Sequence, residues 1–121
     1  MSALSHDTPP PCPRTPAEIA DQWAFFTDPA YPSKERDYAR GVLESLRWVM
    51  GRRADSPVAG DRLGRLPTLW DIETEADRAE EGMRAFTGQG IAWHRAHGLR
   101  YLTGAENALF WLTGEGGETI Y

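Results

Sequence analysis

Apolar residues recur with helical spacing soon after the start of the chain. Ile19, Trp23 and Phe26 stand at positions i, i+4 and i+7, so they share one face of a helix. The preceding residues 15–18 read Thr-Pro-Ala-Glu, which combines a capping threonine, a proline suited to a first turn and a glutamate that closes a capping box. Asp28-Pro29 is expected to end this helix, because the residue before a proline disfavours helical backbone.

A second amphipathic helix is predicted from a cap at Ser33 to about Met50, followed by Gly51 as a left-handed cap. Its apolar stripe consists of Tyr38, Val42, Leu46 and Val49. Gly41 and Trp48 are seven positions apart and share a second face. A glycine inside a helix costs about 1 kcal/mol relative to alanine. We therefore expect a ring or a neighbouring helix to pack closely against Gly41.

A third helix is predicted to start near Thr68, with Asp71 supporting its cap. Its apolar positions step by three and four residues, which is the spacing of a heptad seam: Leu69, Ile72, Ala76, Ala79, Met83 and Phe86. Acidic residues stand between the seam positions, and we interpret them as a solvated face: Asp71, Glu73, Glu75, Asp77, Glu80 and Glu81.

The last third of the chain predicts one short and one longer helix. Residues 91–97 form the short helix, with Gly98 as its cap. Residues 103–106 read Thr-Gly-Ala-Glu, a second capping box, and open a helix that ends near Thr113. This helix is apolar nearly all round, because it carries Ala105, Ala108, Leu109, Phe110, Trp111 and Leu112. Such a helix is either central to a core or half of an interface, and in so small a chain the interface is favoured.

Two stretches repeat the pattern Tyr-x-x-Gly-x-x-x-x-Leu-x-Trp-x-x-Gly with an offset of 63 residues. The first copy uses Tyr38, Gly41, Leu46, Trp48 and Gly51, and the second uses Tyr101, Gly104, Leu109, Trp111 and Gly114. The copies match imperfectly, since Gly41 lies inside its predicted helix and Gly104 in a first turn. The repeat raises the hypothesis of two pseudo-symmetric helical hairpins, in which Trp48 and Trp111 occupy related environments.

Together these patterns predict an all-α fold, a compact bundle of four main helices plus one short helix. Residues 1–14 are expected to be a flexible arm, because four of them are prolines and prolines deny backbone donors. Residues 15–121 are expected to form a single helical domain.

The charge, cysteine content and hydropathy of the chain argue against several classes of function. The net charge is −5, and twelve arginines accompany a single lysine, a bias typical of a GC-rich bacterial genome. Direct nucleic-acid binding is not expected, because it needs a surplus of positive charge. Cys12 is the single cysteine, so an intrachain disulfide is impossible. No apolar run is long enough for a signal peptide or a membrane span, so we expect no membrane association and a cytoplasmic location.

The sequence contains few candidate residues for catalysis or metal binding. His94 and His97 stand three residues apart on the predicted short helix, close enough to share a metal, but no further ligands are singled out. Cys12 lies in the proline-rich arm, and no serine stands in a nucleophile elbow. The loop after the second helix is locally basic through Arg52, Arg53, Arg62 and Arg65, which is typical of a solvated loop and less often of an anion site. No cofactor is expected.

The sequence therefore favours a small protein-interaction module, such as an adaptor, inhibitor or assembly factor, binding another protein or a second copy of itself. The expected interface is aromatic and comprises Phe110, Trp111, Leu112 and Trp48. Two alternatives stay open. One is a small-molecule or metal-binding enzyme with a site around His94 and His97, and the weaker one is a regulator of nucleic-acid machinery acting through the basic loop.

Overall fold

The computed structural model describes residues 10–89 and 97–121. Four α-helices account for most of this part of the chain: α1 (Pro16–Thr27), α2 (Arg36–Val49), α3 (Leu69–Ala85) and α4 (Leu99–Leu112). A 3₁₀ turn, η2 (Ser33–Glu35), leads into α2, and the described ranges contain no β-strand beyond an isolated bridge between Asp55 and Arg62. The predicted all-α bundle is confirmed. The predicted short helix falls on residues 91–97, of which 91–96 lie outside the described residues.

Two of the helix starts follow from the capping residues seen in the sequence. The Thr15 hydroxyl accepts the Glu18 backbone N–H at 3.1 Å, and the Glu18 carboxylate accepts the Thr15 N–H at 2.8 Å. Thr68 and Asp71 form the same reciprocal box at the start of α3. The predicted capping box at Thr15 and the predicted cap at Thr68 are confirmed. Each satisfies backbone donors that a helix otherwise leaves without a partner.

The predicted start of α4 was wrong. The helix begins at Leu99 after Gly98, four residues before the expected start at Thr103. The Thr103 hydroxyl bonds the carbonyl of Leu99 at 2.8 Å, as threonines within helices often do, so it does not act as a cap. Gly104 consequently lies inside its helix, as Gly41 does inside α2. At the other end of the molecule, Ser33 opens the 3₁₀ turn and α2 itself begins at Arg36.

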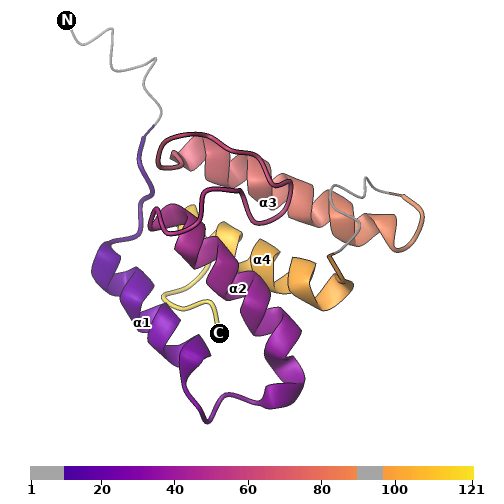
Figure 1. The fold of residues 1–121 in the computed structure, drawn as a ribbon, viewed down its shortest axis with the longest axis horizontal. Coiled ribbons are helices and arrows are strands. Elements are labelled where there is room, and N and C mark those ends of the chain that lie inside the picture. The colour runs from indigo at the N-terminus through magenta and orange to yellow at the C-terminus, as the bar shows by residue number, and fades with distance from the viewer. Residues whose placement is uncertain (1–9, 90–96) are drawn as a thin grey trace, which may run out of the picture.

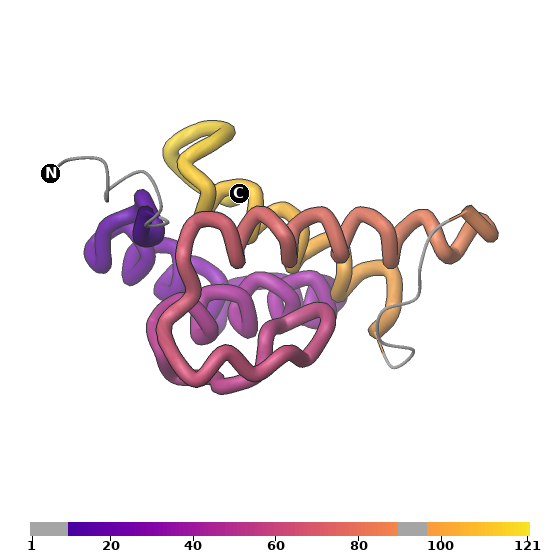
Figure 2. Tube along the Cα trace, turned by 90° about the horizontal axis from the view of Figure 1, so that it is seen from above, coloured from indigo at the N-terminus to yellow at the C-terminus, as the bar shows by residue number. Residues whose placement is uncertain are grey.

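α4 is the central helix of the bundle. It packs against α2 on one side and α3 on another, as Figures 1 and 2 show. Eight of its residues are buried, and they include Tyr101, Leu109 and Leu112. The apolar circumference of this helix thus reflects two packing faces. Val42 and Leu46 of α2, together with Ile72 of α3, complete the fully buried centre.

α2 and α4 approach each other at their glycines. A Cβ added at Gly41 would overlap the Tyr101 carbonyl oxygen and lie 2.7 Å from the Ala105 nitrogen. A Cβ added at Gly104 would overlap the Tyr38 carbonyl oxygen in the reciprocal way. The expected close packing against Gly41 is confirmed, and the packing element is the backbone of α4. Only residues without a side chain allow two helix backbones to come this near.

Segments outside the helices bind the bundle together. The Pro10 carbonyl accepts the Leu69 N–H at 2.8 Å, and Arg14 donates to carbonyls of α4 and of the segment after it. Residues 10–14, which belong to the expected arm, therefore contact the domain. The C-terminal segment turns back toward α1, where the Ile120 N–H donates to the Gln22 side chain at 2.8 Å. No described helix has the length and apolar character needed to cross a membrane.

Candidate functional site

A groove of about 480 Å³ lies between α1 and α2, and we refer to it as the α1–α2 groove. The two helices lie side by side in Figure 1, joined by the turn that contains Pro29 and Pro32. The largest apolar side chains that line it are Trp23 and Phe26 from α1, Tyr31 from the turn and Leu43 from α2. Because Asp28-Pro29 ends α1 as predicted, the chain reverses here and places aromatic residues of both elements around one hollow.

The C-terminal end of α1 gathers several aromatic rings. Phe26 lies 5.0 Å from Phe25 and 5.4 Å from Tyr31 between ring centroids, and Tyr121 stacks on Phe25 at 3.7 Å. Such pairs contribute about 0.5–1.5 kcal/mol beyond the area that they bury. Burial raises the pKa of the Tyr31 hydroxyl, and the Glu35 carboxylate adds to the rise. A tyrosine hydroxyl is already neutral at physiological pH, and the raised pKa keeps Tyr31 neutral further into the alkaline range.

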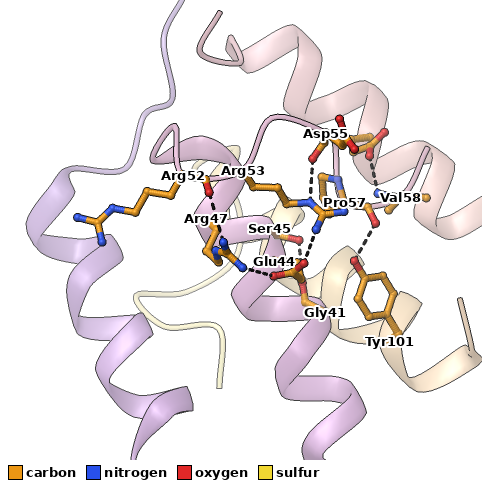
Figure 3. A network of polar contacts seen from close by, with 11 residues as sticks. Gly41, Glu44, Ser45, Arg47, Arg52, Arg53, Asp55, Pro57, Val58 and Tyr101 are labelled. Carbon is orange, nitrogen blue, oxygen red and sulfur yellow. Dashed lines mark hydrogen bonds and ion pairs between the residues drawn. The ribbon is translucent and has the colours of Figure 1, made fainter. Parts of the chain in front are cut away.

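The α2 wall of the groove is rich in arginine. Arg36, Arg40 and Arg47 line it, against Asp28 and Glu44 as the acidic lining residues. Figure 3 shows that Glu44 is shared, since it accepts from both Arg47 and Arg53. The Arg40 guanidinium lies over the Tyr101 ring at 4.7 Å from its centroid. The groove thus combines an aromatic side with a positively charged side.

The loop between α2 and α3 is fixed by buried groups that the sequence pattern did not reveal. The Tyr101 hydroxyl donates to the Pro57 carbonyl at 2.8 Å, a bond drawn in Figure 3. The Glu75 carboxylate accepts the N–H groups of Val58 and Ala59 at 2.6 and 3.0 Å. Burial is the main cause that raises the pKa of Tyr101 to about 12.

The interpretation of Glu75 as part of a solvated face was wrong. Its side chain is buried, with 1% of the residue exposed. The buried stripe of α3 runs through Ile72, Glu75, Ala79 and Gly82, while the seam residue Ala76 is half-buried. The signal in the sequence was the position of Glu75, three residues after Ile72 and four before Ala79, which places it on the inward face.

The basic loop carries less free charge than its sequence implies. Three of its four arginines pair with carboxylates: Arg53 with Glu44, Arg62 with Asp55, and Arg65 with Asp71. The Arg52 side chain points away from the network in Figure 3. These ion pairs neutralise charge within the fold. The four arginines of the loop do not converge on a common point at which a phosphate could bind.

The four residues expected to form an interface separate into two groups. Phe110 is exposed, with 47% of its surface accessible. Trp48, Trp111 and Leu112 are buried at 3%, 2% and 0% exposure, so they support the core of this chain. The Trp111 indole N–H has no acceptor among the described residues, and the Arg14 guanidinium lies 4.3 Å from the ring centroid. Phe110 lies beside Gly116 of the C-terminal segment.

Of the two histidines of the alternative site, His97 lies within the described residues. His94 lies outside the described residues. The His97 ring stacks on Tyr101 with centroids 4.2 Å apart. Within residues 10–89 and 97–121, no group of three or more His, Cys, Asp or Glu side chains has a metal-binding arrangement.

Comparison with protein-family models, with curated proteins and with solved structures gives no match for this chain. Its function is therefore interpreted from the geometry of the α1–α2 groove.

Proposed function

We propose that the chain is a small protein-interaction module, an adaptor, inhibitor or assembly factor of the bacterial cytoplasm, whose aromatic helical surface is the α1–α2 groove. The observation that carries this proposal is the groove itself, about 480 Å³ in volume and lined by Trp23, Phe26 and Tyr31. Aromatic and arginine side chains are the residue types that dominate binding energy at protein interfaces.

Trp23 is the proposed anchor of this surface. Its side chain is half-buried, whereas Phe26, the other aromatic residue of α1 in the groove lining, is buried. Trp23 can therefore lose further accessible area on binding, while its packing against the buried core holds it in place. A tryptophan held in this way loses little rotational freedom when a partner docks.

The test is a selection of random displayed peptides against the purified chain, followed by binding measurements on the natural chain and two variants. We expect the selected peptides to bind the natural chain and to lose about tenfold or more in affinity with Trp23→Ala. Phe110→Ala is the matched control, since it removes an exposed aromatic side chain from α4.

Other outcomes are equally informative. Binding lost with Phe110→Ala and kept with Trp23→Ala would move the interface to α4, where Phe110→Arg should then weaken association with a partner or a second copy. No selected peptide at all would contradict the proposal. A content of about one zinc per chain, lost in a His94→Ala and His97→Ala double variant, would favour the metal-enzyme alternative.

A further inference from the structure

The arginines of the α1–α2 groove form a regular stripe. Arg36, Arg40, Leu43 and Arg47 follow one another at i, i+4, i+7 and i+11, so they share the face of α2 that lines the groove. Successive members i and i+4 are about 6 Å apart along the helix axis, at 1.5 Å per residue. Trp23 and Phe26 form the opposite wall on α1.

This stripe has more positive charge than the fold neutralises. Glu44 accepts from both Arg47 and Arg53, and Glu35, next to Arg36, pairs with Arg100. Among the described residues, neither Arg36 nor Arg40 forms an ion pair with a carboxylate. Arg40 lies over Tyr101, and a guanidinium over a ring keeps N–H donors at its edge. Arg36 begins α2, where the helix dipole adds to the positive potential.

The arginine wall on α2 and the aromatic wall on α1 favour different side chains of one bound segment. In an extended peptide, alternate residues point to opposite sides, and residues two apart are separated by about 6.7 Å. That distance is close to the spacing of Arg36 and Arg40 along α2. Residues i and i+2 can therefore meet the arginines while residue i+1 meets the aromatic wall.

We propose that the α1–α2 groove binds an extended acidic segment of a partner protein, in which acidic and aromatic residues alternate. The proposal rests on the function proposed above and names the chemistry of the partner. The acidic side chains would accept charge-assisted hydrogen bonds from Arg36 and Arg40. The intervening aromatic side chain would pack against Trp23.

A nucleic-acid strand fits this surface less well. The far flank of α1 has a second hollow lined by the carboxylates of Glu18, Asp21, Asp28 and Glu118, with no basic residue in its lining. A polyanion that extends beyond the groove would meet this negative flank, and the net charge of −5 adds to the repulsion. A short acidic segment confined to the groove avoids the negative flank and, because it carries few charges, meets less of the overall repulsion than a polyanion does.

The experiment compares two synthetic peptides of equal composition by calorimetric titration. One carries Glu-Phe-Glu-Phe-Glu and the other Glu-Glu-Glu-Phe-Phe, both between Gly-Ser flanks. We expect the alternating peptide to bind about tenfold more tightly than the block peptide. Its affinity should fall as salt rises, because salt screens exposed charges.

Variants connect this preference to the stripe. Arg36→Gln and Arg40→Gln together should abolish the preference for the alternating peptide, while Arg84→Gln, which removes an exposed charge from α3, should preserve it. Near-ultraviolet circular dichroism of each variant checks that the fold is retained. A variant of Arg36 alone gives the same comparison if Arg40→Gln disturbs Tyr101.

Three results would overturn the inference. They are equal binding of both peptides, a preference that survives in the Arg36→Gln and Arg40→Gln variant, and tighter binding of a Lys-Phe-Lys-Phe-Lys peptide. If neither acidic peptide binds while displayed peptides still bind in a Trp23-dependent way, the acidic segment is wrong and the interaction module stands. If displayed peptides also fail to bind, both proposals are wrong.

Discussion

At the residue scale, Gly41 is the position where the structure leaves least room. A Cβ there would meet the backbone of α4 at Tyr101 and Ala105, and a backbone cannot move aside as a side chain can. We expect Gly41→Ala to lower the free energy of unfolding by roughly 1–2 kcal/mol, since an overpacking cost at the upper end of about 1–3 kcal/mol outweighs the gain in helix propensity of about 1 kcal/mol. Urea denaturation measures the change. Gly117→Ala is the control, because nothing lies within 4 Å of a Cβ there; an unchanged midpoint for Gly41→Ala would contradict the packing.

Tyr101 predicts how stability responds to alkaline pH. Its pKa is raised from 10.0 to about 12, mainly by burial. The unfolded chain releases the proton first, so the contribution of Tyr101 is intact below pH 10 and is lost as the pH rises toward 12. The loss should approach about 2–3 kcal/mol, at 1.36 kcal/mol per pKa unit.

Tyr101→Phe separates this contribution from the rest of the molecule. The variant should be less stable at neutral pH, because the Pro57 carbonyl loses its donor, and it should lose less stability than the natural chain above pH 10. Thermal unfolding followed by circular dichroism across this range measures both effects. Equal alkaline slopes for the two proteins would show that Tyr101 does not titrate in this way.

Glu75 gives a third prediction at a single residue. Its carboxylate accepts two backbone N–H groups of the loop while almost wholly buried. Glu75→Ala should cost on the order of 2–4 kcal/mol, because the buried Val58 N–H and the partly buried Ala59 N–H lose their acceptor. Glu73→Ala, at an exposed position of α3, is the control and should change stability little. A cost for Glu75→Ala no larger than that of the control would contradict this role.

At the scale of elements, α1 depends on segments that lie far away in sequence. Arg14 donates to the carbonyls of Trp111, Glu115 and Gly117, while Ile120 bonds Gln22 and Tyr121 stacks on Phe25. We expect Arg14→Gln to increase hydrogen exchange in α1 and in residues 113–121, with α2 and α4 still protected. Arg100→Gln removes an exposed ion pair elsewhere and should leave α1 unchanged. Uniform loss of protection across all helices would show that α1 has no separate stability.

Local sequence patterns predicted some of the helix boundaries but not which helices pack together. The capping box at Thr15 and the cap at Thr68 located two helix starts, because the side chains at these positions satisfy N–H groups that the first helical turn leaves free. The second predicted capping box, at Thr103, failed because tertiary packing against Gly41 extends α4 through it. The α1–α2 groove was not predicted, since its walls come from two helices whose relative placement no local pattern encodes. Buried loop contacts such as that of Glu75 are equally non-local.

At the scale of the whole molecule, the repeated pattern corresponds to equivalent structural roles. Trp48 and Trp111 are both buried, and each is followed three residues later by a glycine with positive φ, 76° at Gly51 and 89° at Gly114. The helices that precede α2 and α4 differ, since α3 packs along α4 whereas α1 meets α2 across the groove. The correspondence therefore belongs to α2 and α4. Gene duplication remains a hypothesis about their origin.

The reciprocal contact of the two glycines leads to a prediction about energetic coupling. Gly41 faces the carbonyl of Tyr101, and Gly104 faces that of Tyr38, so an added methyl group at either site separates the same two helices. Once one methyl group has moved the backbones apart, the second meets less resistance. The double variant Gly41→Ala and Gly104→Ala should therefore lose less stability than the sum of the single losses. Independent sites add within about 0.3–0.5 kcal/mol, so a double-mutant cycle by urea denaturation resolves the difference. Additive losses would mean that each glycine is accommodated locally, and that the approach of α2 and α4 is not one shared contact.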